Sequence, residues 1–298
     1  MTVMSLPSHS AFDPRNLVLW SIPIIGLLLL LYWDITNALV ADWYNDPDYS
    51  HGFLVPFLSV FFVWERWGDI TQTRIQPSWW GIGLLGFGLL MLVIGLVGAE
   101  LYTQRCSLIA VLGGLVLLIF GWNMMWVVSL PLAFLIFMVP LPAIVVNTIA
   151  FPLQLFAAKT ATFCLFSLGI PVLREGNLIA LAGTTLEVAE ACSGLRSLLS
   201  LLALGTVYGY FSQAVIWKRW MLVFLSIPIA IIANAIRVSG TGILAHYWGV
   251  EAAEGFYHTF EGWIVFIAAF VMLLVCGSLL SWMGTGRNRK GQDVEIRE

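Results

Sequence analysis

The sequence predicts an all-α protein, a polytopic integral membrane helical bundle with about eight spans. Of its 298 residues 60% are hydrophobic and only 10% are charged, whereas about a quarter of an average soluble domain is charged. The mean hydropathy is +0.91. Only helices and closed barrels satisfy their backbone polar groups in lipid. The apolar runs do not alternate with polar residues, so they favour helices over a barrel.

The apolar runs give the expected elements in order along the chain. They cover 17–33, 52–66, 79–98, 106–121, 124–140, 144–169, 193–211, 219–245 and 259–282. A spanning helix needs roughly 20 apolar residues. The first run follows a weakly charged leader without a small-residue cleavage site, so we expect a retained helix rather than a signal peptide. We predict one transmembrane domain over 1–283 and a flexible cytoplasmic tail over 284–298.

The charged loops predict the orientation of the helices, because Lys and Arg concentrate in cytoplasmic loops. The loop 34–51 has four Asp and no Lys or Arg, so we expect it outside. The segments with Lys and Arg, expected inside, are 65–78, 212–219 and 284–298. The segments 170–192 and 246–258 then face outward.

One apolar run conflicts with this orientation. Nine full crossings from a cytoplasmic N-terminus would place 170–192 inside. One run between 106 and 169 therefore should not cross. The candidate is 124–140, because Pro131 interrupts it and Pro140-Leu141-Pro142 ends it. It is either re-entrant or merged with a neighbour, which leaves about eight spans.

The segment 176–188 alternates partly between apolar and polar residues around Gly183. Such alternation around a glycine predicts a short β-hairpin. An ordinary loop is the alternative. Either would lie outside the membrane, directly before Cys192.

Cys192 is the strongest candidate for a reactive group. It lies in 190–196 (Glu-Ala-Cys-Ser-Gly-Leu-Arg), where polar residues give way to an apolar run. A helix N-terminus or a nearby cation lowers the pKa of a thiol and makes it nucleophilic. Gly194 permits a tight turn and Arg196 follows about one helical turn later. The alternative is a small buried hydrophobic residue.

The four cysteines form no Cys-x-x-Cys pair. This spacing disfavours both a metal site and a disulfide framework. No basic tract indicates a nucleic-acid partner. We therefore expect no cofactor, no metal and no nucleic acid.

Arg237 lies within an apolar run, three residues after Asn234 and on the same helical face. Charges in or near a span are usually paired or functional. Alternatively, Arg237 extends to the lipid headgroups. His258 begins the last run from the outer side, where an imidazole that titrates near neutral pH can exchange a proton with a thiol. An interfacial histidine beside Tyr257 and Trp263 is the alternative.

The other histidines are weaker candidates. His246 is a competitor of His258, and His51 lies in the motif 49–56 at the end of an outward loop. Glu190 is expected to be solvated, unless it orients the histidine.

Cys192, Arg237 and His258 come from separate runs, yet the predicted topology places all three near the outer face. Their chemical types fit one reaction. A cysteine attacks a carbonyl, a histidine activates the thiol and protonates the leaving amine, and an arginine donates hydrogen bonds to the oxyanion.

These motifs resemble the exosortase/archaeosortase family of integral membrane enzymes, over about 15–285 of the chain. The residues that carry the resemblance are 49–56 (Tyr-Ser-His-Gly-Phe-Leu-Val-Pro), 168–176 (Leu-Gly-Ile-Pro-Val-Leu-Arg-Glu-Gly), 190–197 (Glu-Ala-Cys-Ser-Gly-Leu-Arg-Ser), 234–237 (Asn-Ala-Ile-Arg) and His258. The Cys-Ser-Gly-Leu-Arg box is fairly specific within a polytopic protein. The other elements are weak alone and specific in this order.

The resemblance implies a cysteine protease or transpeptidase in the bacterial inner membrane, with its active site facing the periplasm. Its implied substrates are exported proteins that end in a Pro-Glu-Pro motif, a transmembrane helix and a basic cluster, in a sorting system associated with exopolysaccharide. Cys192 would carry an acyl-thioester, and Arg237 and His258 would complete the triad. Which of the two donates the proton is open in the family, and the permanent charge of arginine favours His258. Asn234, Arg196, Glu190 and His51 are possible supporting residues.

Two other classes of protein remain open. In a transporter or lipid-linked sugar translocase, Arg237 would bind substrate within a pathway, although no inverted repeat is visible. The second class is a non-enzymatic subunit of exopolysaccharide export. A serine intramembrane protease is disfavoured because the Gly-x-Ser-x-Gly signature is absent. The sequence does not indicate an oligomeric state.

Overall fold

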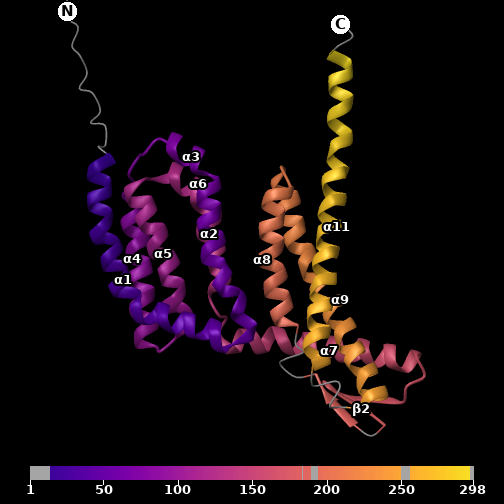
Figure 1. The fold of residues 1–298 in the computed structure, drawn as a ribbon. Helices are drawn as coiled ribbons and strands as arrows, with labels where there is room; N and C mark the ends of the chain where they lie inside the picture. The colour runs from indigo at the N-terminus through magenta and orange to yellow at the C-terminus, as the bar shows by residue number, and fades with distance from the viewer. Residues whose placement is uncertain (1–13, 183, 189–193, 250–255, 296–298) are drawn as a thin grey trace, which may run out of the picture. The chain divides into compact units, whose positions relative to one another are not determined.

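The computed structural model describes residues 14–182, 184–188, 194–249 and 256–295 (Figure 1). Side chains are described over 23–182, 184–188, 194–249 and 262–283. Cys192 and Glu190 lie outside the described residues. The side chain of His258 does too, although its backbone belongs to a described helix.

Each predicted apolar run forms one principal helix. In chain order these are α1 (Pro14–Asn45), α2 (Leu54–Glu65), α4 (Trp80–Val97), α5 (Leu101–Ile119), α6 (Trp122–Phe134), α7 (Ala143–Ser167), α8 (Leu195–Ser212), α9 (Ile216–Trp248) and α11 (Phe256–Glu295). The short elements are η1 (Pro47–Phe53), α3 (Trp67–Gln72) and η2 (Leu135–Met138). The prediction of an all-α, polytopic membrane protein is confirmed.

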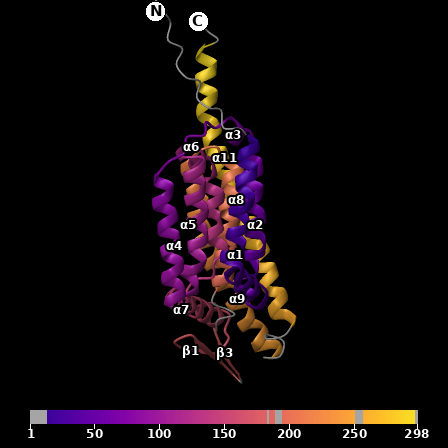
Figure 2. The same cartoon turned by 90° about the vertical axis from the view of Figure 1, so that its left-hand side faces the viewer.

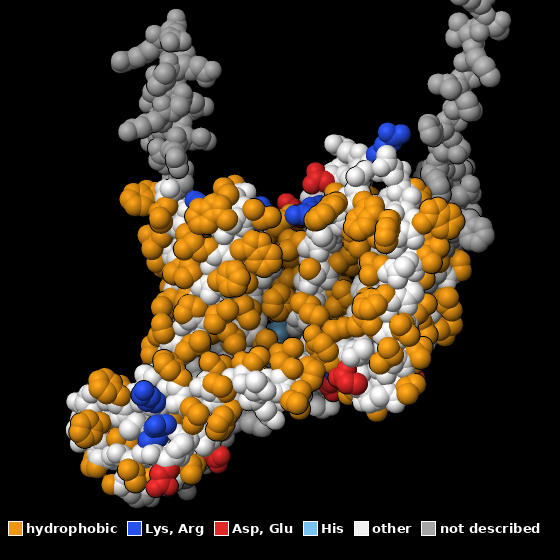
Figure 3. Space-filling view, turned by 180° about the vertical axis from the view of Figure 1, so that it is seen from behind, with side chains coloured by type: hydrophobic (Ala, Val, Ile, Leu, Met, Phe, Trp, Pro, Cys, Tyr) orange, Lys and Arg blue, Asp and Glu red, His pale blue; other side chains and the backbone are white. Residues whose placement is uncertain are grey.

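Six helices of the described chain are long and apolar enough to cross a membrane. They cover Pro23–Asn45, Trp80–Val97, Leu101–Ile119, Ala143–Ser167, Ile216–Trp248 and Gly262–Met283. The other three apolar runs form α2, α6 and α8. Hydrophobic side chains cover much of the helical surface in Figure 3, whereas charged ones gather near helix ends and on a small lobe. An apolar exterior of this kind suits contact with lipid.

The described chain divides into two compact units, which we describe separately. Unit 1 comprises Met1–Asp46 and Phe53–Pro140, and unit 2 comprises Pro47–Gly52 and Leu141–Glu298. The residues 47–52 of η1 therefore belong to unit 2, although the helices on either side of them belong to unit 1.

Glycines bring α4 and α5 of unit 1 into close contact. Gly81, Gly88 and Gly95 recur every seven residues on one face of α4. A Cβ at Gly88 would lie 2.8 Å from a methyl group of Val111, and one at Gly95 would lie 2.7 Å from Cγ of Gln104. Small residues at such spacing allow membrane helices to approach closely, which strengthens their van der Waals packing.

Polar side chains inside unit 1 are paired. The guanidinium of Arg105, which is buried in α5, lies 2.6 Å from the carboxylate of Asp42 in α1. Glu100 caps α5 by accepting hydrogen bonds from Thr103 and Tyr102, and the bond with Thr103 lowers the pKa of its carboxyl. A pKa that is lower in the folded state stabilises the fold above the unfolded pKa, and this contribution is lost as the pH falls through the folded value.

Exposed tryptophans mark one end of unit 1. They lie at the end of α2, in α3 and at the starts of α4 and α6, and they are Trp64, Trp67, Trp79, Trp80, Trp122 and Trp126. Tryptophan is enriched at membrane–water interfaces. This end includes the loop 65–78, which the positive charges assign to the cytoplasmic side.

Pro131 lies inside α6 without ending it. A proline has no N–H to donate to the carbonyl four residues earlier, here that of Val127. Nη1 of Arg66, at the end of α2, donates to this carbonyl at 2.6 Å. This tertiary hydrogen bond satisfies the carbonyl that Pro131 leaves without a donor, and the helix continues past Pro131 into η2.

We expect Arg66→Ala to destabilise the packing of α2 on α6 by about 1–3 kcal/mol, because the half-buried carbonyl of Val127 would lose its donor. Thermal unfolding in detergent measures the effect. Arg74→Ala, in the same loop, is the control and should leave the melting temperature within about one degree. Equal melting temperatures for the two variants would contradict this role of Arg66.

Unit 2 contains a small antiparallel sheet of strands β1 (Val172–Glu175), β2 (Leu178–Leu181) and β3 (Thr184–Glu187), in the order β1-β2-β3. Val172 pairs with Leu181, and Leu178 pairs with Glu187. The hairpin expected over 176–188 is therefore β2–β3, and β1 extends it to three strands.

The sheet packs on α7, and α7 packs on the second half of α9. The core there consists of the buried residues Ala157, Ala158, Ala161, Leu165, Ile170, Ile179, Leu181, Val188, Val238 and Ala245. Small alanines on α7 let α9 and the sheet approach the same helix. This core fixes the sheet close to the segment that leads into Cys192.

The runs 124–140 and 144–169 form helices that differ in length. The run 124–140, which is expected not to cross, forms α6 and η2, and α6 packs along α2 and α5. Within unit 2, α7 lies across the ends of α8 and α11 beside the sheet (Figures 1 and 2). Its exposed surface combines Phe156 and Phe163 with Lys159, a mixture typical of interfacial helices. The run 124–140 lies largely in the shorter apolar helix Trp122–Met138, which is not among the six membrane-capable helices and so agrees with the expectation that it does not make a full crossing, whereas α7 is long and apolar enough to cross.

Side chains near the turn between α8 and α9 hold α11 in place. Tyr208 donates to the carbonyl of Leu274, Gln213 to that of Gly277 at 2.9 Å, and Lys218 to that of Leu280 at 2.5 Å. These carbonyls lie at successive turns along one side of α11. The backbone of α11 is helical as far as Glu295, so it extends through most of the segment predicted as a tail.

Candidate active site

The described part of the candidate site lies in unit 2 and comprises three segments. They are the turn 47–52, the first turn of α8, and the middle of α9. Cys192 precedes α8 by three residues, and His258 belongs to the first turn of α11. Neither the sulfur of Cys192 nor the imidazole of His258 is among the described atoms.

Gly194 is the N-cap residue of α8 and fixes where the Cys192 segment ends. Its φ of +76° lies in the left-handed region, which side chains with a Cβ disfavour. Its α carbon also faces Asn234 of α9, so a Cβ here would lie 2.7 Å from Cγ of Asn234. Both the backbone conformation and this close approach require glycine.

Asn234 and Arg237 lie three residues apart on α9 and are both buried, with exposed fractions of 5% and 9%. A snorkelling arginine keeps its charged head exposed at the headgroups, so the burial of Arg237 argues against that alternative. Because Asn234 touches Gly194, the end of the Cys192 segment lies on the face of α9 that carries Arg237.

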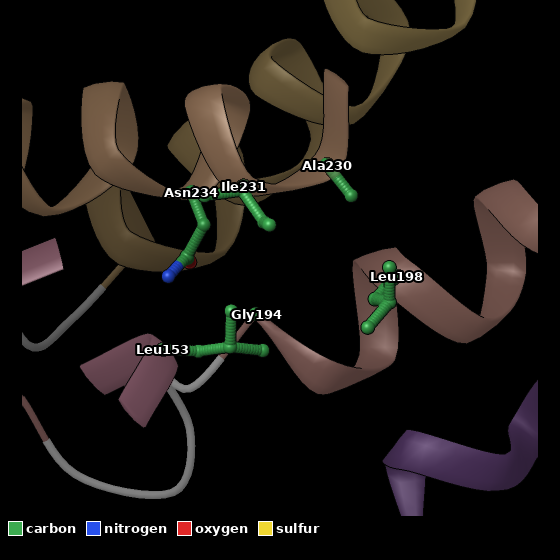
Figure 4. Close-up of a pocket in the computed structure, with 6 residues that line it drawn as sticks. All are labelled: Leu153, Gly194, Leu198, Ala230, Ile231 and Asn234. Atoms are coloured by element: carbon green, nitrogen blue, oxygen red, sulfur yellow. The ribbon is translucent and has the colours of Figure 1, made fainter. Parts of the chain in front are cut away.

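A small cavity adjoins this contact (Figure 4). It is lined by Leu153, Gly194, Leu198, Ala230, Ile231 and Asn234 and has a volume of about 10 Å³. That volume is at the lower limit for one water molecule. The cavity is therefore too small for a peptide.

The turn η1 contributes an acidic and an aromatic group to the same unit. Oδ1 of Asp48 accepts a hydrogen bond from Nε of Arg196 at 2.9 Å. Tyr49 is buried, and its ring lies 6.5 Å from the half-buried ring of His51. The loop that contains Asp48 is thus in contact with the first turn of α8.

Asp48 is a candidate that sequence reasoning missed. In the sequence, Asp48 was only one of the four aspartates from which the loop 34–51 was expected to lie outside. The signal that was available is its position one residue before the Tyr-Ser-His-Gly motif. His246, the weaker alternative to His258, lies in the last turn of α9, where its ring packs on Tyr247.

The other three cysteines lie within helices. Cys106, Cys164 and Cys276 are half-buried within α5, α7 and α11. Across the described ranges, no three His, Cys, Asp or Glu side chains gather as a metal site would require.

We expect Gly194→Ala to impair both stability and function, because an added Cβ meets the side chain of Asn234 in a strained backbone conformation. The strain amounts to about 1–2 kcal/mol. Thermal unfolding in detergent checks the loss, with Gly262→Ala as the control, since a Cβ there meets nothing within 4 Å. A Gly194→Ala variant as stable as Gly262→Ala would contradict the observed contact.

Comparison with known proteins agrees with these observations. The chain matches the profile of the transmembrane exosortase family over residues 43–275. Searches of curated proteins and of solved structures returned no significant match. The matched region begins just before η1 and includes the Cys192 segment, Asn234, Arg237 and His258. Because it covers well over half of the 298 residues, the chain belongs to the transmembrane exosortase family.

Proposed function

We propose that this protein is a cysteine peptidase or transpeptidase that removes C-terminal sorting signals from exported proteins at the outer face of the bacterial inner membrane. The observation that carries the proposal is the contact of Gly194 with Asn234. Two residues span at most about 7 Å, so the Cα of Cys192 is within that distance of Gly194. This limit supports Cys192 as the nucleophile, because it allows the thiol to approach the face of α9 that bears Arg237.

In the proposed reaction, the thiolate of Cys192 attacks the carbonyl carbon of the scissile peptide bond. The guanidinium of Arg237 donates hydrogen bonds to the oxyanion that forms. As the tetrahedral intermediate collapses, the C–N bond breaks and His258 gives its proton to the leaving amine. The acyl group stays on sulfur as a thioester until water or an acceptor amine attacks it.

The location of Cys192 favours a reactive thiolate. It precedes the N-terminus of α8, where the positive end of the helix dipole lowers the pKa of a thiol. The buried cation of Arg237, on the face of α9 next to the end of this segment, favours the same ionisation. Both positive charges therefore favour the thiolate form of Cys192, which is the form that acts as a nucleophile.

The proposed substrates carry a Pro-Glu-Pro motif, a transmembrane helix and a basic tail. Co-expression of the full chain with such a substrate tests the proposal, because tail removal shortens the substrate on a gel. Hydroxylamine should release a hydroxamate of the substrate if a thioester forms. An intact substrate in the presence of well-inserted protein would instead favour the transporter or non-enzymatic alternatives.

A further inference from the structure

Arg196 occupies a position that is electrostatically unfavourable for a cation. It lies in the first turn of α8, close to the positive end of the helix dipole. Its side chain is 51% exposed, and an ion pair at such an exposed site contributes little to stability. Stability therefore gives little reason for an arginine at this position, whereas an anionic ligand would be favoured there by the guanidinium and the dipole together.

Asp48 holds the guanidinium of Arg196 by one edge only. The bond at 2.9 Å uses Nε, one of five N–H donors in the fork. Within the described residues, no other polar contact of this guanidinium is found. Nη1 and Nη2 present a planar pair of donors, the geometry that binds a carboxylate through two parallel hydrogen bonds.

The chain length limits the distance between Arg196 and the proposed nucleophile. Arg196 follows Cys192 by four residues, which span at most about 14 Å between α carbons. An extended substrate peptide rises about 3.3 Å per residue. A peptide whose scissile carbonyl lies at Cys192 thus has a side chain within reach of Arg196 about four residues or fewer from the cleaved bond.

We propose that Arg196 recognises a carboxylate side chain of the substrate, within about four residues of the scissile bond, and that Asp48 is a positioning residue for its guanidinium. This inference rests on the proposed peptidase function and adds a determinant of specificity to it. The glutamate of a Pro-Glu-Pro motif has the required chemistry. Because Asp48 belongs to η1, its hydrogen bond links Arg196 to the turn that carries Tyr49 and His51.

Reciprocal charge reversal tests this role. Full-length protein in liposomes is given peptide substrates that differ only in the acidic residue, which is Glu, Gln or Arg. The wild-type protein should lose about ten- to a hundredfold in kcat/KM between the Glu and Gln substrates, mainly through KM. Arg196→Glu should reverse the preference and cleave the Arg substrate better than the Glu substrate.

Two further variants separate recognition from structure. Arg174→Glu is the matched control, because Arg174 is an exposed arginine of the same unit on β1 whose Nη1 donates to the carbonyl of Gly176. It should keep the wild-type preference. Asp48→Asn should weaken, without reversing, the discrimination between Glu and Gln.

The outcomes distinguish this inference from the function on which it rests. If Arg196→Glu lowers cleavage of the Glu and Arg substrates by the same factor, the arginine is structural and the inference is overturned. The same holds if the wild-type protein cleaves Glu and Gln substrates equally well. If the wild-type protein cleaves no substrate at all, the peptidase proposal itself fails.

Discussion

Replacing Cys192 with alanine is expected to abolish removal of the sorting tail, while the protein still inserts into the membrane. Without the thiol no acyl-thioester can form, and loss of a nucleophile lowers turnover by about 10⁴-fold or more. The measurement is the fraction of substrate shortened after co-expression, with the amount of membrane-inserted protein determined in parallel. Cys192→Ser should also be inactive, because a serine hydroxyl at neutral pH is far less ionised than a thiol.

The chain provides matched controls for this experiment. Alanine replacements of Cys106, Cys164 and Cys276 remove half-buried thiols that have no role in the proposed reaction. They should leave processing within about twofold of wild type. If Cys192→Ala still shortens the substrate, the nucleophile is another group and the proposed reaction is wrong.

Replacing Arg237 with glutamine is expected to slow processing by about 10²–10³-fold, the effect of removing one oxyanion donor. The loss should be in kcat, because the proposed hydrogen bonds form in the transition state and not with the bound substrate. Arg237→Lys should recover only part of the rate, since an ammonium lacks the planar fork. Single-turnover acylation of Cys192, followed by mass spectrometry, measures this step directly.

A comparison with His258→Gln distinguishes the roles of the two residues. If His258 transfers the proton, its loss should flatten the pH dependence of kcat near neutral pH, whereas Arg237→Gln should lower the rate evenly across pH. A change in KM alone for Arg237→Gln would show that the guanidinium binds the substrate uniformly. Such a result would favour a substrate-binding arginine over an oxyanion donor.

The sequence predicted the helices well because burial in lipid imposes a local rule. Every backbone group in a span must be satisfied within its own helix, so a continuous apolar run specifies one element without information from elsewhere. Each of the nine runs accordingly became one principal helix, and the alternating segment before Cys192 became β2 and β3. The chemical types of the candidate residues were also readable from their motifs.

Contacts between distant residues could not be predicted in the same way. The bond of Arg66 to the carbonyl of Val127, which repairs the helix at Pro131, joins residues 61 positions apart, and the pair of Asp48 and Arg196 joins residues 148 apart. Such pairs depend on which helix faces pack together, and neither hydropathy nor charge bias encodes that choice. The direction of α7 within unit 2 is a further case, since neither its length nor its composition specifies it.

By itself, then, the sequence determined that the chain is a helical membrane protein. Its ordered motifs indicated a cysteine at the outer face, followed later in the chain by an arginine and a histidine. Tertiary structure alone decided that Gly194 meets Asn234, that Arg237 is buried, and that the turn 47–52 joins α8 through Asp48. The physical reason is the range of the forces involved. Desolvation in lipid acts on each segment separately, whereas side-chain packing and hydrogen bonding act only between groups that the whole fold has brought within a few ångströms.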